Sequence, residues 1–210
     1  MLLTTFVYAN QPQWDDDKIN WTELDLAIYN MDNSNIVNYI HDNLEFLNEG
    51  RNATNTIEIA MRVNNEYAVY ELLNSGIIFD LDELLIWACI FNSNVQIVMY
   101  LVDFGANINY VRANGYNCLM AATSFSSIEV MRYLIYNNID VNIGRRLADG
   151  FTALTLAIYN MNFEKIEILL EAGASPCNIN NTGETALNLA ENLTKRLEIE
   201  QRERILSLFR

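Results

Sequence analysis

Few residues in this sequence could do chemistry. It contains a single histidine, His41, and three widely spaced cysteines, Cys89, Cys118 and Cys177. This set lacks the spacing of a zinc site, and no nucleophile motif such as G-x-S-x-G accompanies the histidine. Glycine-rich phosphate-binding loops are missing as well. The sequence therefore predicts a protein that is not an enzyme and that uses no metal and no cofactor.

The charged residues are distributed unevenly along the chain. The net charge is −14, and residues 1–110 hold 16 Asp and Glu against three Lys and Arg. Residues 111–210 hold 11 Asp and Glu against 10 Lys and Arg. Acidic surface of this density repels nucleic-acid phosphates and attracts basic proteins. We therefore expect a protein partner with a basic surface and no nucleic acid, although the charge could also serve solubility alone.

The cysteines and the apolar runs bear on where the protein works. Three cysteines without a pairing pattern or a CxxC motif are typical of reduced thiols in a non-oxidising compartment. No stretch approaches the roughly 18 apolar residues of a membrane span, and no basic residue precedes the short apolar run at the start. We expect a cytoplasmic protein that binds no membrane and is monomeric when free.

An internal repeat defines the elements that would position a binding surface. Residues 149–174 contain a turn glycine, then T-A-L-T-L-A, a short break, and a second apolar segment that ends in L-L-E-A-G-A. Residues 182–190 repeat the opening, and Gly150 and Gly183 lie 33 residues apart. A ladder of alanines extends the period through the chain: Ala27, Ala60, Ala88, Ala122, Ala157 and Ala190. A parallel series closes each second helix: Asn43, Gly76, Gly105, Asn138 and Gly173.

The residue types in both series have physical reasons. Small alanines allow neighbouring first helices to stack closely, and Gly or Asn tolerates the left-handed conformation that ends a helix. The step from Ala60 to Ala88 is only 28 residues. This leaves too little chain for a full hairpin over residues 76–84, so we expect a short connection between the second and third units.

The pattern resembles the ankyrin repeat in its period and in its T-x-L-x-L-A motif. The resemblance implies an all-α ankyrin-repeat solenoid of stacked helix-turn-helix units with short β-turn or hairpin loops. About six units would occupy residues 21–210, the last as a C-terminal cap, after a non-repeat N-terminal extension over residues 1–20. The family's T-P-L-H tetrapeptide, whose His knits adjacent repeats, is absent from all six units. We therefore expect a locally irregular stack.

The same resemblance implies binding through the loop tips and the concave face of the first helices. In five of the units we considered the residue after the turn position and the two residues at the end of the first helix, which makes 15 positions. Seven of these 15 positions are aromatic, against 11% of the chain. Such residues should be rare at solvent-facing positions and are common in protein interfaces, although some could pack under an adjacent loop. We call them the aromatic row: Trp21, Tyr29, Phe91, Tyr116, Phe125, Phe151 and Tyr159. Arg62 maps to the same surface and completes the predicted partner-binding set.

Three functions fit a protein–protein interaction module of this kind. The first is an inhibitor or immunity-type protein that binds and neutralises a toxin or enzyme, in one variant by mimicking nucleic acid. The second is an adaptor or effector that recruits or scaffolds another protein. The third is a chaperone of a basic protein. We favour the first, because a small acidic stack with an aromatic row suits the occlusion of a basic partner.

Overall fold

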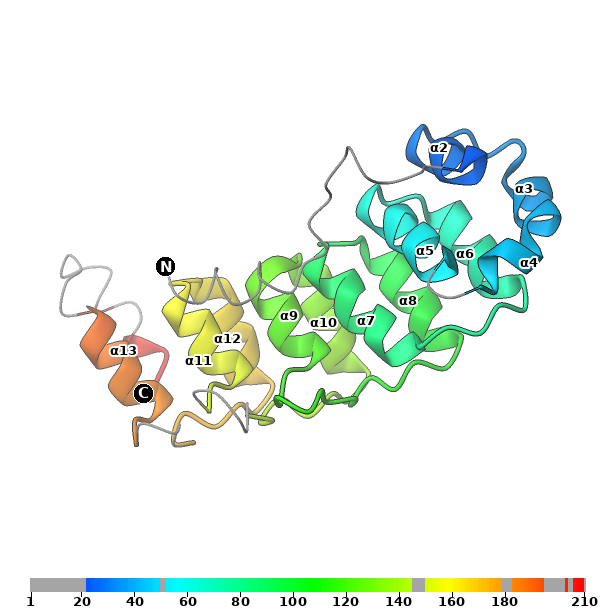
Figure 1. Ribbon diagram of the computed structural model, residues 1–210. Coiled ribbons are helices and arrows are strands. Elements are labelled where there is room, and N and C mark those ends of the chain that lie inside the picture. The colour runs from blue at the N-terminus through cyan, green and yellow to red at the C-terminus, as the bar shows by residue number, and fades with distance from the viewer. Residues whose placement is uncertain are drawn as a thin grey trace.

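The described helices follow one another in pairs and form two layers (Figure 1). The predicted extension over residues 1–20 and most of the predicted C-terminal cap helix lie outside the described residues. None of the helices in the described part is long and apolar enough to cross a membrane. The all-α solenoid predicted from the sequence is confirmed. The computed structural model describes residues 22–49, 52–144, 150–178, 183–194, 203 and 206–209.

The first helix of each unit lies in one layer. Each of these helices packs against the next one in the series, and Figure 1 shows α7, α9, α11 and α13 in a row. All six ladder alanines are at most 9% exposed, so they allow the close stacking that the sequence predicts. The layer consists of α2 (Glu23–Tyr29), α5 (Asn52–Arg62), α7 (Leu81–Ile90), α9 (Cys118–Phe125), α11 (Ala153–Tyr159) and α13 (Ala186–Thr194).

The second helices form the other layer, and the apolar core fills the space between the two. Large side chains such as Ile57, Leu85 and Leu119 are fully buried there. A short extra helix, α4 (Leu44–Leu47), follows the first pair. The second layer consists of α3 (Ile36–Asp42), α6 (Glu66–Asn74), α8 (Val95–Asp103), α10 (Ile128–Tyr136) and α12 (Phe163–Glu171).

Polar side chains fix the starts of the helices. Thr22 and Thr152 form capping boxes at the starts of α2 and α11. At four further helices an asparagine side chain accepts a hydrogen bond from the backbone N–H three residues later: Asn65, Asn94, Asn117 and Asn162. Each such cap satisfies a backbone donor that the helix cannot, and typically stabilises a protein by about 1 kcal/mol.

Left-handed residues end the second helices, with one exception. Gly76, Gly105, Asn138 and Gly173 have φ between 61° and 109°, as the sequence predicts. Asn43 has a φ of −114°, so the expectation of the same ending in the first unit was wrong. Its side-chain amide instead donates to the carbonyl oxygen of residue 39 at 2.7 Å, and the chain continues into α4.

The connections between units differ along the stack. The segment over residues 75–80 joins the second and third units without any β-bridge, and its Ile78 is 95% exposed. The predicted short connection is therefore confirmed. The next two connections each close on an antiparallel bridge, between Val111 and Asn117 and between Gly144 and Thr152. These two follow the hairpin-like pattern of the resemblance.

A side chain near the turn between the two helices of a unit anchors that unit to the preceding first helix. The acceptor is always a carbonyl oxygen near the C-terminal end of that helix. These turn-to-helix anchors recur in the second to fifth units and join neighbouring repeats without the family's His. The donor–acceptor pairs are Asn65 Nδ2 to Ile28 at 3.1 Å, Ser93 Oγ to Met61 at 3.1 Å, Ser126 Oγ to Cys89 at 2.6 Å, and Lys165 Nζ to Ala122 at 2.9 Å.

Lys165 differs from the other anchors because it carries a charge. It is only 6% exposed, and its ammonium also donates to the carbonyl oxygens of Thr123 and Ser126, both at 2.8 Å. Its three bonds saturate the ammonium's donors at the negative end of α9. Burial lowers the pKa of this group. A lysine on a second helix is thus an internal part of the stack.

Candidate protein-binding surface

The C-terminal ends of the first helices share one edge of their layer, because these helices lie side by side. We call this edge the first-helix face. It carries five of the eight residues predicted to bind a partner, one from each of the first five units. They are Tyr29 at the end of α2, Arg62 at the end of α5, Phe91 as the C-cap of α7, Phe125 at the end of α9 and Tyr159 at the end of α11.

These five residues are accessible to different degrees. Tyr29 is 56% exposed and Tyr159 is 37% exposed. Phe91 and Phe125 are half-buried and pack against the core with part of their rings. Phe151, which precedes α11, is also half-buried, and its ring centroid lies 6.4 Å from that of Tyr159. The aromatic row is therefore most open at the two ends of the described stack.

Two members of the row do not belong to the accessible surface that the structure describes. Tyr116 is 6% exposed and lies in the core, which corrects the expectation that it is a surface contact. The cause is local: the backbone N–H of Arg112 donates to its carbonyl oxygen at 2.9 Å, and a bridge closes the connection on itself. The ring is thereby packed inside the unit. Trp21 lies outside the described residues.

The centre of the first-helix face contains an Arg–aromatic stack, which consists of Arg62, Phe91, Trp87 and Arg112. The Cζ atom of Arg62 lies 3.8 Å from the centroid of the Phe91 ring. The rings of Phe91 and Trp87 are stacked, with centroids 5.4 Å apart and planes at 22°. The Cζ atom of Arg112 lies 4.9 Å from the Trp87 ring. Cation–π attraction thus holds two guanidinium groups against two rings in a fixed order.

Glu83 fixes one end of this stack. Its carboxylate accepts hydrogen bonds from Nε and Nη2 of Arg112, the shortest at 2.6 Å, and from the hydroxyl of Tyr110 at 3.0 Å. The bond to this carboxylate raises the pKa of Tyr110. At the other end, burial lowers the pKa of Arg62, while the nearby Glu58 acts in the opposite direction. Both arginines are held in place before any partner arrives.

The composition and order of this stack suit recognition of a protein partner. Arg and Trp are enriched among the residues that dominate protein interfaces, and prearranged side chains lose little entropy on binding. The mapping from the sequence found Arg62 and Phe91 but missed Trp87, Arg112 and Glu83. One signal was available: Glu83, Trp87 and Phe91 are spaced by four residues and therefore share one side of a helix. Within the described ranges no three His, Cys, Asp or Glu residues are grouped to hold a metal ion.

Comparison with known protein families agrees with this geometry. A model of three ankyrin repeats matches residues 57–145, and a model of a single ankyrin repeat matches residues 149–181. The chain belongs to the ankyrin repeat family. Ankyrin repeats are in general a non-enzymatic fold that mediates protein–protein interactions, and this chain is an interaction module of that kind.

Several known proteins match part of the chain. A putative ankyrin repeat protein of fowlpox virus (strain NVSL) is 38% identical over 98 residues, which are 46% of this chain and 28% of that protein. The human transient receptor potential cation channel subfamily A member 1 is 35% identical over 92 residues, 43% of this chain and 8% of the channel. The bovine ankyrin repeat and SOCS box protein 3 is 34% identical over 84 residues, 40% of this chain and 16% of that protein. The matched stretch thus spans well under two thirds of each relative.

Proposed function

We propose that this ankyrin protein binds a basic surface of a partner protein with its first-helix face and thereby inhibits the partner. The Arg–aromatic stack supports the proposal most directly, because it presents two arginines and two rings in a prearranged order at the centre of the face. In this proposal the protein has no catalytic activity and uses no cofactor. It acts as a monomer in the cytoplasm.

The charge around the stack supports a basic partner. The sequences of α2, α5 and α7 contain five acidic residues and one basic residue, whereas those of α9 and α11 contain no charged residue. Acidic groups beside an apolar, aromatic centre speed the approach of a basic protein and favour one orientation of docking. Because the two arginines are already engaged with rings and with Glu83, they need not repel such a partner strongly.

An adaptor role is the second candidate, and the relatives favour it. The stretch that matches this chain is a minor part of each of them, including the bovine protein whose name joins ankyrin repeats to a SOCS box. That name pairs ankyrin repeats with a further segment. An adaptor would hold its partner without blocking the partner's activity.

Affinity capture of the partner, followed by measurement of the dissociation constant with the purified partner, tests the proposal. The change of Trp87→Ala together with Arg62→Ala should weaken binding about 100-fold, because both side chains lie in the prearranged centre. Tyr29→Ala is a second variant that carries little risk to the fold, since this ring is 56% exposed. Tyr136→Ala is the control, because Tyr136 is 85% exposed but lies on the second-helix layer.

Two further measurements decide between the candidates. Association should slow markedly between about 50 and about 200 mM salt if acidic groups steer a basic partner. The partner's own activity should fall when one equivalent of this protein is added, whereas an adaptor would leave it unchanged. Equal loss of binding in Tyr136→Ala and in the Trp87→Ala, Arg62→Ala variant would contradict the assignment of the face.

A further inference from the structure

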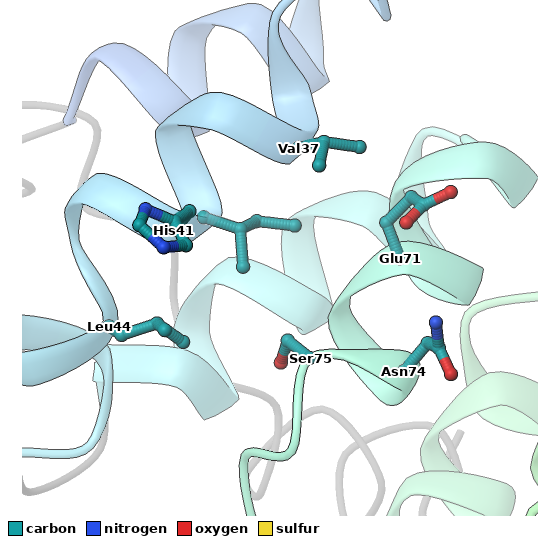
Figure 2. A pocket seen from close by; sticks show the side chains of 7 residues that line it. Val37, His41, Leu44, Glu71, Asn74 and Ser75 are labelled. Atoms are coloured by element: carbon teal, nitrogen blue, oxygen red, sulfur yellow. The ribbon is translucent and has the colours of Figure 1, made fainter.

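A groove of about 200 Å³ lies on the second-helix layer, between the first and second units. Val37 and Ile40 of α3 and Leu44 of α4 line one side, and Glu71 and Asn74 of α6 line the other. Figure 2 shows Val37 and Leu44 on one side of the groove and Glu71 and Asn74 on the other. His41 and Ser75 complete the lining, so a mainly apolar wall with one imidazole lies opposite a polar wall with one carboxylate, the acidic wall.

The irregular end of α3 creates this groove. In the later units a left-handed residue ends the second helix and turns the chain back at once. After α3 the chain continues through Asn43 into α4. Leu44 at the start of α4 belongs to the apolar wall, and Leu47 at its end is buried, with 3% exposure. The irregular end of the first unit thus shapes this hollow.

The surroundings of the groove are apolar and acidic. Val37 is 48% exposed, and Phe46 of α4 and Tyr67 of α6 are 43% and 40% exposed. The sequences of α3, α4 and α6 contain four acidic residues and no Lys or Arg. Exposed apolar side chains at this density commonly mark protein interaction sites. Glu71 in the lining, with the acidic excess of these helices, favours an occupant that is positively charged or neutral.

The size of the groove limits what it can hold. Pockets for drug-sized ligands and cofactors have volumes of about 300–1,000 Å³. A volume of about 200 Å³ has room for one anchoring side chain of a peptide. A phosphate or another anion would meet the carboxylate of Glu71 without any lysine or arginine from these three helices.

We infer that this groove binds a short basic peptide segment of a partner protein, with one aliphatic or aromatic side chain seated against Val37, Ile40 and Leu44. A lysine or arginine next to that anchor pairs with Glu71. The site is on the layer that carries the second helices, so it is separate from the first-helix face. The protein therefore has a second docking surface that is independent of the proposed inhibitor site.

A labelled peptide made only of leucine and lysine, arranged as an amphipathic helix, is the probe. Fluorescence anisotropy with the whole chain should show binding of this peptide, and at least about 10-fold weaker binding when serine replaces its leucines or glutamate replaces its lysines. Backbone amide chemical shifts should change in α3, α4 and α6. Equal binding of the serine–lysine peptide would show attraction by charge alone and would overturn the inference.

Two variants and a matched control locate the peptide. Asn74→Trp fills the groove from an exposed position, and Glu71→Lys reverses the charge of its acidic wall. Both should weaken binding by about 10-fold or more, whereas Glu167→Lys, the same charge change at an exposed position of α12, should alter it less than about 2-fold. Circular dichroism melts verify that each variant is folded.

The failure of this inference is distinguishable from the failure of the proposed function. If Glu167→Lys weakens peptide binding as much as Glu71→Lys does, binding follows net charge and the groove is not a site. If Trp87→Ala weakens peptide binding, and the backbone amide chemical shifts that the peptide changes belong to α7, the peptide occupies the first-helix face. That result would overturn the groove inference. Unchanged peptide binding in the Trp87→Ala variant, with loss in Asn74→Trp, supports the groove whatever the role of the face.

Discussion

The first three units and the fourth and fifth units are held together by different contacts. In the first part, the connection over residues 75–80 has no bridge, and units depend on neutral anchors such as those of Asn65 and Ser93. In the second part, bridges close the connections, and the charged anchor of Lys165 joins α12 to α9. The acidic residues of the chain are concentrated in the first part. Bridged connections and a lower excess of acidic residues therefore occur together.

The loops reinforce the same difference. Beyond the third unit, asparagine side chains accept backbone N–H groups of the next connection, Asn109 from Asp140 at 2.8 Å and Asn142 from Ser175 at 2.7 Å. Such bonds tie one loop to the next along the edge of the stack. Because each unit in a solenoid contacts only its neighbours, stability is a sum of local terms and can differ between the two parts. The comparison suggests that the first part opens more easily, which substitutions can test.

The largest expected effect is that of Lys165→Met. The change retains most of the side-chain volume but removes the ammonium donor from three carbonyl oxygens, of which that of Ala122 still accepts from the backbone N–H of Ser126. Leaving a buried acceptor unsatisfied costs about 1–3 kcal/mol, so this change should lower the free energy of unfolding by about 3 kcal/mol or more. Urea unfolding followed by circular dichroism measures it. Ser93→Ala, which removes a single neutral anchor, should cost about 1 kcal/mol, and an equal cost for both would contradict a special role of the charge.

Asn65→Ala is expected to have the next largest effect. Asn65 caps α6 and also donates to the carbonyl oxygen of Ile28, so its loss should cost about 2 kcal/mol. Asn162 caps α12 in the corresponding position of the fifth unit, where Lys165 makes the anchor instead. Asn162→Ala should therefore cost only about 1 kcal/mol. The same unfolding measurement compares them, and the reverse order would show that capping and anchoring are not combined in Asn65.

Two methionines provide a smaller test in the opposite direction. Met31 and Met161 follow the first helices of the first and fifth units with φ of 58° and 53°, a conformation that glycine adopts without strain. Met31 is 48% exposed, so Met31→Gly should raise the free energy of unfolding by about 0.5–1 kcal/mol. Met161 packs partly against the core, so Met161→Gly should gain less. Thermal melts compare the two, and a loss of stability in Met31→Gly would contradict the account of strain.

The smallest effect is expected in the short connection. Ile78 is 95% exposed, so Ile78→Lys should change the free energy of unfolding by less than about 0.5 kcal/mol. Removing an exposed apolar side chain should also reduce self-association at high concentration, which light scattering can detect. A large loss of stability would mean that this connection contributes more to joining the units than its contacts indicate.

The sequence predicted the parts of the fold that depend on a single repeat. The alanine ladder and the left-handed helix ends depend on local geometry, so the residue types alone identified these positions. The helix ends are Gly76, Gly105, Asn138 and Gly173. Asn43 did not follow, because an asparagine can also end a helix by donating its side-chain amide to a carbonyl four residues back. Asn43 and Asn138 are the same residue type, and only the residues of α4 that follow Asn43 distinguish the two helix ends.

The candidate site was less predictable because it depends on contacts between units. The mapping places a residue relative to its helix but does not show whether a loop covers it, as at Tyr116. Trp87 lies one turn before the mapped position on α7, and its place in the stack depends on Arg112 of the next connection. Lys165 is an ordinary charged residue of an amphipathic helix until the carbonyls of α9, 39 to 43 residues earlier, are placed beside it.

The turn-to-helix anchors also have a direction. In every pair the acceptor belongs to the earlier unit and the donor to the later one, as with Ile28 and Asn65 or Ala122 and Lys165. A ribosome synthesises the acceptors first, and domains generally fold as the N-terminal part emerges. Each newly made unit therefore supplies the donor side chain, and the preceding unit already holds the acceptor carbonyl. The stack can be built in the order of translation, without any completed unit having to reopen for the next.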